Sequence, residues 1–295
     1  MKVSRRELLK WSVAGGVAAS ASGLMIPLLR NLAPAQARVE VEKKPPVAPS
    51  PHGETTKHRH WAMVVDLRKC EGCTTIDAPP QCTQACIQEH FVPQGQQWIE
   101  VFEEELPTGG TSFMPAPCYQ CENAPCVNVC PVGASYHSPE GIVLIDHNRC
   151  IGCRLCMAAC PYHRRFFNWG QPKVPPEAAF ANYSPEYPVP AKRGTVIKCM
   201  FCAHRAREGK LPACVEGCPM KALYFGDLNE DLATNGAQLV QLRRFLAENN
   251  AFRYKEDLGT QPRVWYIPGH GEVFGHHSSS HKLKLPNRWP WEEES

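Results

Sequence analysis

The sequence lacks the short motifs that mark most nucleotide-dependent and nucleophilic enzymes. It contains no Walker loop, no Rossmann fingerprint and no nucleophile elbow, so nothing in it indicates a substrate site of its own. It also has little net charge, with 32 Lys and Arg against 29 Asp and Glu, which argues against a nucleic acid as the main partner. A mean hydropathy of −0.35 excludes a polytopic membrane protein.

What the sequence has in excess is cysteine and proline. Of its 295 residues, 16 are cysteine and 28 are proline, while apolar residues make up 43%. The proline content predicts many turns and irregular loops, and the apolar content excludes a disordered chain. We therefore expect a loop-rich globular protein that is organised by its cysteines.

The first 37 residues have the order of a secretory signal. Arg5 and Arg6 form a pair within SRRELLK, an apolar stretch follows at 11–29, and a small-residue site ends at Ala37. The arginine pair makes the segment similar to a Tat signal, so we expect a periplasmic protein that is exported already folded. An uncleaved membrane anchor is the alternative, although the glycines of this stretch make it a poor permanent span.

The cysteines fall into four groups of four with none left over. Each group begins C-x2-C and ends C-x3-C, and a proline follows the last cysteine in all but the first group. The groups are Cys70, Cys73, Cys82, Cys86; Cys118, Cys121, Cys126, Cys130; Cys150, Cys153, Cys156, Cys160; and Cys199, Cys202, Cys214, Cys218.

The third group has the spacing of a bacterial ferredoxin, C-x2-C-x2-C-x3-C-P. In that spacing three cysteines on a tight loop reach one 4Fe–4S cluster, and the fourth completes a second cluster. We expect the fourth cysteine to stand at the start of a helix that faces away from the first cluster. This logic requires motifs in pairs, and the chain supplies two pairs.

An internal repeat supports the pairing. Residues 65–73 align with 145–153, and residues 130–136 align with 218–224. In both alignments a β-rich segment leads into a cysteine loop or leaves one. The repeat predicts a duplicated unit of strand, cysteine loop, short helix and strand, with strands at 63–67, 142–145 and 222–225.

Three other uses of the cysteines have to be considered. Disulfides are natural in an exported protein, and zinc is often held by four thiolates, but neither usually shows this spacing. Covalent haem needs C-x-x-C-H, and in Cys199–His204 the histidine comes one position too late. Four 4Fe–4S clusters, with the sixteen cysteines as iron ligands, are the expected cofactors.

The pattern resembles the iron–sulfur subunit of molybdopterin oxidoreductases and related quinone-linked membrane complexes, such as the polysulfide, dimethyl sulfoxide, tetrathionate and formate enzymes. The resemblance covers about residues 61–268 and is most specific in PCYQCENAPCVNVCPVGA, RCIGCRLCMAACPYHRRFF and KCMFCAHRAREGKLPACVEGCP. Among members with a Tat signal, it is similar to the periplasmic subunit of the membrane complex linked to dissimilatory sulfite reduction.

The resemblance implies which cysteines act together. The implied ligand sets are Cys70, Cys73, Cys82 with Cys218; Cys199, Cys202, Cys214 with Cys86; Cys118, Cys121, Cys126 with Cys160; and Cys150, Cys153, Cys156 with Cys130. The first group departs from the family pattern, because eight residues separate Cys73 from Cys82 and no proline follows Cys86. We expect this insert at the surface.

The expected fold is α+β, with tandem bacterial-type ferredoxin-like domains, long irregular loops, a C-terminal amphipathic helix and an extended tail. In 236–249 the helical spacing of Leu239, Leu242 and Phe245 predicts that helix, and 263–267 reads as a strand. The expected divisions are a signal at 1–37, a flexible linker at 38–60, an outer domain at 61–117 and 195–235, an inner domain at 118–170, a proline-rich insertion at 171–194, a helix and strand on the core at 236–268, and the tail at 269–295.

The resemblance implies an electron-transfer subunit without a catalytic site. It would pass single electrons between a membrane quinone-reactive subunit and a molybdopterin or cytochrome partner, in a hetero-oligomeric complex that faces the periplasm. Membrane association would come through the partners or through an uncleaved signal. The alternatives are a self-standing iron–sulfur enzyme or sensor with an open iron, and a zinc-bearing structural protein.

Two further sets of residues are candidates for tuning the clusters. Apolar side chains beside the cysteines would keep water away: Val127, Val129, Ile151, Leu155, Met157, Met200 and Phe201. Basic side chains would raise the reduction potential of an anionic cluster: Arg149, Arg154, His163, Arg164, Arg165, Lys198, Arg205 and Arg207. Ordinary core packing explains the apolar set equally well, and a solvated or partner-facing surface explains the basic set equally well.

Overall fold

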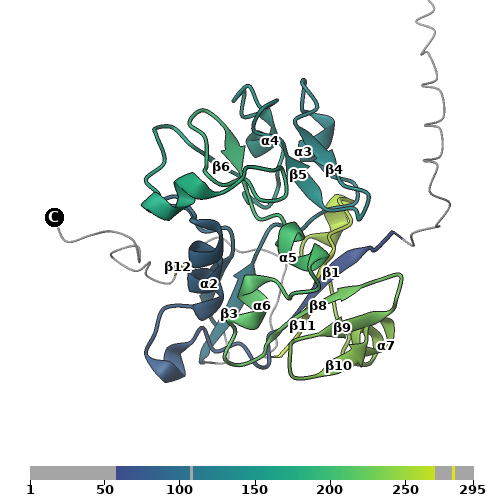
Figure 1. The fold of residues 1–295 in the computed structure, drawn as a ribbon. Coiled ribbons are helices and arrows are strands. Elements are labelled where there is room, and N and C mark those ends of the chain that lie inside the picture. Colours follow the sequence, from purple (N-terminus) through teal and green to yellow (C-terminus); the bar gives the residue numbers. More distant parts are fainter. Residues whose placement is uncertain (1–57, 107–108, 270–280, 283–295) are drawn as a thin grey trace, which may run out of the picture. The chain divides into compact units, whose positions relative to one another are not determined.

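The computed structural model of the chain describes residues 58–106, 109–269 and 281–282 (Figure 1). The predicted signal, the linker up to residue 57 and most of the predicted tail lie outside the described residues. The end of the linker is held in place rather than free, because the backbone N–H of His60 donates to Asp227 Oδ1 at 2.8 Å. Within the described part of the chain, no helix has the length and apolar character needed to cross a membrane.

A five-stranded sheet with the order β10-β9-β8-β1-β11 carries much of the core. Its strands are β1 (Trp61–Asp66), β8 (Leu223–Asp227), β9 (Leu232–Thr234), β10 (Leu239–Gln241) and β11 (Val264–Ile267). Strand β1 pairs antiparallel with β8 and parallel with β11, and all its residues are buried. The strands predicted at 63–67, 222–225 and 263–267 are thus confirmed, with slightly shifted ends.

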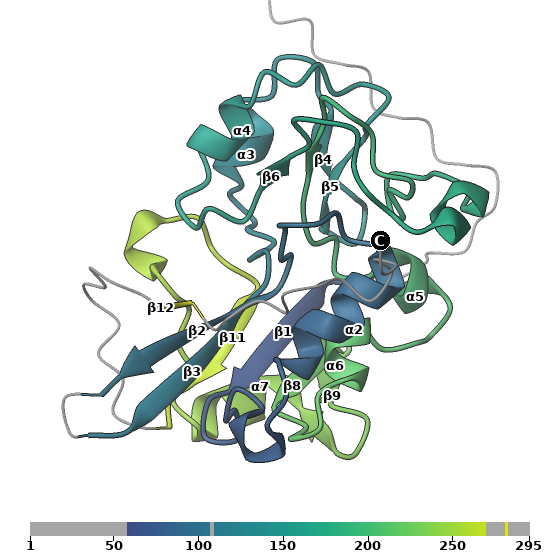
Figure 2. The ribbon, with the colours of Figure 1, turned by 90° about the vertical axis from the view of Figure 1, so that its left-hand side faces the viewer.

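Smaller strand pairs surround this sheet. They are β2 (Glu100–Glu105) with β3 (Thr111–Ala116), β4 (Ser135–His137) with β5 (Val143–Ile145), and β6 (Phe166–Phe167) with β7 (Val196–Ile197). The one described piece of the tail, β12 (His281–Lys282), adds to β2. Figure 2 shows the β2–β3 hairpin beside β11, with β4, β5 and β6 at the opposite end of this view.

The helices are short. They are α2 (Gln81–His90), α3 (Pro125–Asn128), α4 (Leu155–Ala158), α5 (Ala203–Arg207), α6 (Ala213–Glu216) and α7 (Leu242–Glu248), with 3₁₀ turns η2 (Thr74–Ile76), η3 (Pro176–Phe180) and η4 (Glu256–Leu258). The eight-residue insert of the first cysteine group forms η2 and lies largely at the surface, as predicted.

The third cysteine of every group occupies the second position of a helix. These residues are Cys82 in α2, Cys126 in α3, Cys156 in α4 and Cys214 in α6. The fourth cysteine follows one turn later, so the prediction that it begins a helix is wrong. In three groups the helix stops before a Cys-Pro pair, since proline disfavours a helical conformation in the residue before it. The first group has no such proline, and α2 continues past Cys86 to His90.

The two faces of β1 pack into different clusters of apolar side chains. Met63 and Val65 join the main core with most of the cysteines, whereas Ala62 and Val64 lie in a smaller cluster. Helix α7 packs on that smaller cluster through Leu242. The predicted amphipathic helix at 236–249 is therefore shorter than expected and lies against the sheet face away from the main core.

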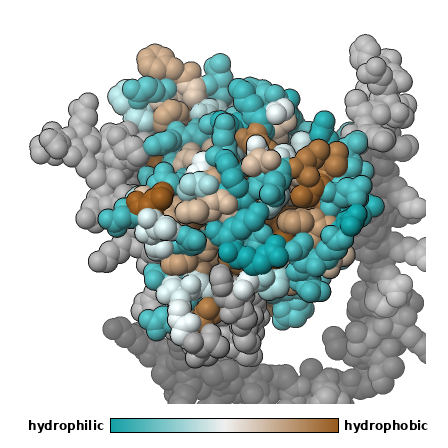
Figure 3. Space-filling model, turned by 90° about the horizontal axis from the view of Figure 1, so that it is seen from below, coloured by the Kyte–Doolittle hydropathy of each residue, from teal (hydrophilic) through white to brown (hydrophobic). Residues whose placement is uncertain are grey.

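The reason for the shorter helix is the strand β10, which takes up its expected first half. Leu239 lies in β10 with 69% of its surface exposed, and the strand pairs with β9. Figure 3 views the molecule from below, and shows apolar residues in separate patches between polar ones. Leu232 of β9 is a further exposed apolar side chain, at 42%.

The proline-rich insertion at 171–194 is ordered and tied down at two points. The Tyr183 hydroxyl donates to Asp146 Oδ1 at 2.9 Å, and the Tyr187 hydroxyl donates to the carbonyl of Glu89 at 3.1 Å. The insertion thus touches both the approach to the third cysteine group and α2. The division into outer and inner domains stays a prediction.

Candidate iron–sulfur cluster sites

All sixteen cysteines lie within the described residues, and all are free thiols. Eleven are buried, four are half-buried and Cys153 is exposed. A disulfide scaffold, one of the alternatives considered from the sequence, does not agree with this arrangement. The thiols instead gather in sets that combine cysteines from different groups.

The first set lies at the junction of β1, α2 and the start of β8. Cys70, Cys73, Cys82 and Cys218 line one small cavity. Burial raises the pKa of Cys70 to about 12, and the neighbouring Cys218 and Cys73 thiols add to the rise. The backbone N–H of Gln81 donates to Cys73 Sγ at 3.4 Å, and that of Ala222 donates to Cys218 Sγ at 3.4 Å.

A second set lines another small cavity, beside β4 and α4. It consists of Cys130, Cys150, Cys153 and Cys156, and Arg165 joins them on the wall. Burial opposes a charge on Cys130, but backbone N–H groups of residues 132–135 outweigh it and leave the pKa of this thiol lowered. Such a ring of N–H donors stabilises a thiolate, the form that binds metal.

A third set gathers around α3. Burial raises the pKa of Cys121 to about 12, and the thiols of Cys118, Cys126 and Cys160 contribute to the rise. Arg165 Nη2 donates to Cys126 Sγ at 2.8 Å. The same arginine therefore contacts this set and lines the cavity of the previous one.

The fourth set combines Cys86 of α2 with the fourth cysteine group. Burial raises the pKa of Cys86, as do the neighbouring thiols of Cys199, Cys202 and Cys214. His90 Nε2 lies 3.1 Å from Cys202 Sγ. Burial, followed by the charge of His204, lowers the pKa of His90 to about 3, so its imidazole is neutral and can donate an N–H to this sulfur.

The donor sets fit an iron–sulfur cluster. Thiolate is the metal-binding form of cysteine, and a bound metal removes the thiol proton that burial otherwise retains. Among the described residues, no three Cys, His, Asp or Glu side chains converge closely enough to hold one metal ion. At the two cavities the thiols surround a space, as a multi-atom cluster requires, whereas zinc draws four sulfurs to about 2.3 Å of one point.

Arg165 provides an independent test of that fit. The residue is 4% exposed, and two of its nitrogen atoms, Nε and Nη1, are buried without a hydrogen-bond partner. Burial lowers the pKa of Arg165, but the charges of Cys126, Cys156 and Cys118 outweigh it and leave the pKa raised. An unbalanced cation beside two sets of thiols fits the negative charge of cysteine-bound clusters.

Comparison with known proteins agrees with this geometry. The family model described as a 4Fe-4S dicluster domain matches residues 110–175 and 186–228. The chain is 40% identical to a subunit of the selenate reductase of Mesobacillus selenatarsenatis, over 70% of this chain and 71% of that protein. It is 39% identical to the iron-sulfur subunit of a putative dimethyl sulfoxide reductase of Halobacterium salinarum, over 71% of this chain and 79% of that protein.

A third relative is the menaquinone reductase, iron-sulfur cluster-binding subunit of Nitratidesulfovibrio vulgaris. It is 36% identical, over 70% of this chain and 88% of that protein. The chain belongs to the iron–sulfur subunits of respiratory oxidoreductases. The family resemblance and the electron-transfer role predicted from the sequence are thereby confirmed.

In this iron–sulfur subunit each set of thiols has a neighbouring set. Cys82 is one of the thiols that raise the pKa of Cys86, so the first and fourth sets are neighbours. Cys118 likewise raises the pKa of Cys199, after burial, and so joins the fourth set to the third. Arg165 then connects the third set with the second.

The predicted shielding residues of the subunit divide into two kinds. Met200 and Phe201 are buried at 3% and 1%, and Val127 and Met157 are half-buried against the core. The prediction is wrong for three others, because Val129, Ile151 and Leu155 are exposed at 38%, 64% and 50%. These three stand on the outer side of the cysteine loops and cannot keep water from the thiols.

The predicted basic residues also differ in what they contact. Arg164, Arg205 and Arg207 form ion pairs with glutamates, and Arg149, Arg154 and His163 are exposed. Arg165 and Lys198 remain as buried cations. Lys198 Nζ donates to the backbone carbonyls of Val143 and Cys199.

Sequence reasoning did not identify His90 or Arg263. His90 stands one turn after Cys86, which is the signal that could have revealed it. Arg263 is 1% exposed, and its guanidinium donates to the carbonyls of Gln120 and Glu140 at 3.0 and 3.2 Å. Burial lowers the pKa of Arg263 to about 10 in spite of Glu122, Cys121 and Cys118 nearby.

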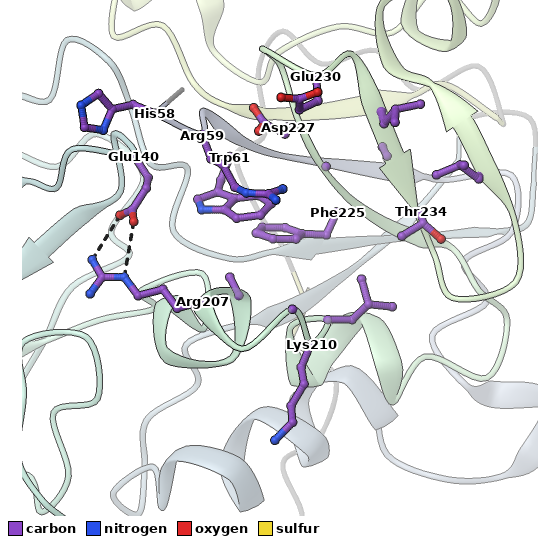
Figure 4. Close-up of a pocket in the computed structure, with 17 residues that line it drawn as sticks. His58, Arg59, Trp61, Glu140, Arg207, Lys210, Phe225, Asp227, Glu230 and Thr234 are labelled. Carbon is purple, nitrogen blue, oxygen red and sulfur yellow. Dashed lines mark hydrogen bonds and ion pairs between the residues drawn. The ribbon is translucent and has the colours of Figure 1, made fainter. Parts of the chain in front are cut away.

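A broad open cleft lies apart from the thiols, and none of its lining residues is a cysteine (Figure 4). Trp61 and Phe225 stack in it with ring centroids 4.9 Å apart. Arg59 lies 5.2 Å from the centroid of the Trp61 ring, and Arg207 pairs with Glu140 at 3.3 Å.

Proposed function

We propose that the subunit holds four 4Fe–4S clusters, one in each set of thiols, and relays single electrons along them. The proposed ligand sets are those implied by the resemblance: Cys70, Cys73, Cys82, Cys218; Cys86, Cys199, Cys202, Cys214; Cys118, Cys121, Cys126, Cys160; and Cys130, Cys150, Cys153, Cys156. The observation that carries the proposal is that neighbouring thiols in the fold group into these four sets across the sequence groups.

Each bound cluster would supply a one-electron couple, with a potential that depends on hydrogen bonds, burial and charge. The residues of this chain hold and surround that couple. Backbone N–H groups donate to Cys73, Cys130 and Cys218, and the His90 ring lies against Cys202. Buried Met200 and Phe201 exclude water beside the fourth group.

The order of the four sets supports a path for electron transfer, but it does not give the direction in which the electrons flow. One end is the set with Cys218, under the insert of the first group, and the other is the set with the exposed Cys153. Electrons would enter at one end and leave at the other. The partners would therefore meet the subunit near these two ends.

Metal analysis tests the proposal directly. Anaerobically purified protein should contain about sixteen irons and about sixteen acid-labile sulfides per chain, at four of each per cluster. Zinc without sulfide would overturn the proposal in favour of a structural protein. About twelve irons with sixteen intact cysteines would overturn the count of four.

We further propose that the subunit is exported through its Tat-like signal and works in a periplasm-facing complex. The partners would be a membrane quinone-reactive subunit and a molybdopterin or cytochrome subunit. The support is the Arg5–Arg6 pair and the relatives' names, which include a menaquinone reductase and a selenate reductase. Replacing both arginines by lysine should abolish export, and secretion of the variant at the normal level would overturn this route.

A further inference from the structure

Arg165 lies between two of the proposed cluster sites. It directly precedes β6, and its Nη2 donates to Cys126 Sγ at 2.8 Å. It also lines the cavity of Cys130, Cys150, Cys153 and Cys156. The Cys156 thiol of that cavity is a further hydrogen-bond contact of the Arg165 side chain. One side chain thus acts on thiols of two successive sets.

No carboxylate balances this guanidinium in the part of the chain that the structure describes. Its hydrogen bond to an oxygen goes to a neutral group, Ser135 Oγ at 2.8 Å, and its other contacts are with the thiols of Cys126 and Cys156. The adjacent Arg164 is buried to a similar degree but is paired with Glu100 Oε2 at 2.6 Å. A buried charge without a counter-ion is costly, so the negative charge has to come from the cysteine-bound groups.

We propose that Arg165 is the shared counter-cation of these two sites and raises the reduction potentials of both. The inference rests on the proposed function. Reduction adds one electron, and hence one negative charge, to a site, and no bond forms or breaks. A fixed positive charge in a buried, weakly screened position favours the more negative form. The two sites with Cys82 and Cys86 lack this contact and are left unchanged.

The test is a redox titration of the full-length subunit, with dithionite as the electron donor and low-temperature paramagnetic resonance as the readout. In Arg165→Gln, two of the four potentials should fall. At a fixed potential the ratio of reduced to oxidised cluster should drop at least tenfold, which is about 59 mV for one electron. Arg165→Lys keeps the charge and should restore potentials near those of the wild type.

Arg154 supplies a matched control, because it lines the same cavity but is exposed. Solvent screens its charge, so Arg154→Gln should leave the potentials within error of the wild type. Unchanged potentials in an iron-replete Arg165→Gln protein would overturn the proposal. An equal fall of all four potentials would also overturn it, because it would indicate that the substitution loosens the whole fold rather than removing a local charge.

A second pair of variants keeps the guanidinium in place. Ser135→Asp puts a carboxylate against Arg165, whereas Ser135→Asn is its neutral counterpart. The Asp variant should show lower potentials than the Asn variant at the same two sites. Equal potentials would show that a charge at this position does not act on the two sites, and would overturn the role of Arg165 even if Arg165→Gln loses iron. Failure of the proposed function would look different, since the wild type itself would then lack iron.

Discussion

Cys82 and Cys86 lie one helical turn apart on α2, yet their thiols belong to different sets. Cys82 shares a cavity with Cys70 and Cys218, whereas the pKa of Cys86 responds to the thiols of the fourth group. Residues four apart are neighbours on a helix surface. This single turn therefore brings two proposed clusters together and fixes their separation.

The first prediction follows from that turn. Cys82→Ala and Cys86→Ala should each disturb one cluster, but not the same one. Paramagnetic spectra of the dithionite-reduced variants should show that Cys82→Ala loses the signal also lost in Cys73→Ala. Cys86→Ala should lose the signal also lost in Cys202→Ala. A shared loss between Cys82→Ala and Cys202→Ala would contradict the proposed pairing.

The second prediction concerns Gly152, which lies inside the loop of the third group. Its φ is +71°, and an added Cβ would stand 2.3 Å from the carbonyl oxygen of Gly194. Because that neighbour is backbone, the loop must shift to admit a methyl group. Gly152→Ala should therefore lose iron from the set with Cys153, measured as iron per chain and as the loss of one paramagnetic signal.

Gly133 is the control for backbone strain alone. Its φ is +61°, and an added Cβ meets nothing within 4 Å. Gly133→Ala should cost only about 1–2 kcal/mol of stability and retain full iron. If both alanine variants keep their iron, the close approach of Gly194 does not matter for the loop.

Spacing predicted that cysteine motifs act in pairs, and the family resemblance implied which groups pair. The spacing of group three indicated that its fourth cysteine binds a different cluster from the other three. The repeat of 65–73 in 145–153 indicated the strands that lead into the cysteine loops. The missing proline after Cys86 was visible in the sequence too, but its consequence, a longer α2, needed the structure. Local rules of this kind act through a few covalent neighbours, and a sequence displays them.

Long-range packing was harder to predict. Leu239 has helical spacing with Leu242, but β-pairing with β9 takes it into a strand. Ile151 and Leu155 look like core residues, yet the cysteine loops turn them outward. Arg164 and Arg165 are adjacent and chemically identical. Only the folded structure reveals that Arg164 pairs with Glu100, whereas Arg165 contacts thiols.

The third prediction concerns the loss of stability at acidic pH. His147 is 4% exposed, and burial lowers its pKa to about 4. Below its ordinary pKa of about 6.5 the unfolded chain binds a proton that the folded protein excludes, so stability falls as the pH drops from about 6.5 to 4. The slope reaches about 1.4 kcal/mol per pH unit.

His147→Gln should remove that part of the acid sensitivity. The readout is the temperature at which visible cluster absorbance is lost at a fixed scan rate, compared at pH 7.5 and pH 5.5. The difference between the two pH values should be smaller in the variant than in the wild type. An identical difference would mean that other groups account for the acid response.

The last prediction concerns the buried ion pair of Arg164 and Glu100. The two side chains are 7% and 5% exposed, and Nη1 lies 2.6 Å from Oε2. Breaking a buried pair leaves one charge uncompensated and costs about 3–5 kcal/mol. Glu100→Gln should therefore lower the temperature of cluster loss, while replacing both residues by methionine should recover part of the loss.

Arg244 and Glu248 form a pair of similar length, 2.7 Å, at 71% and 58% exposure. Arg244→Gln should leave that temperature unchanged, because solvent replaces the contact, and an equal fall in both variants would show that burial is not what gives the inner pair its importance.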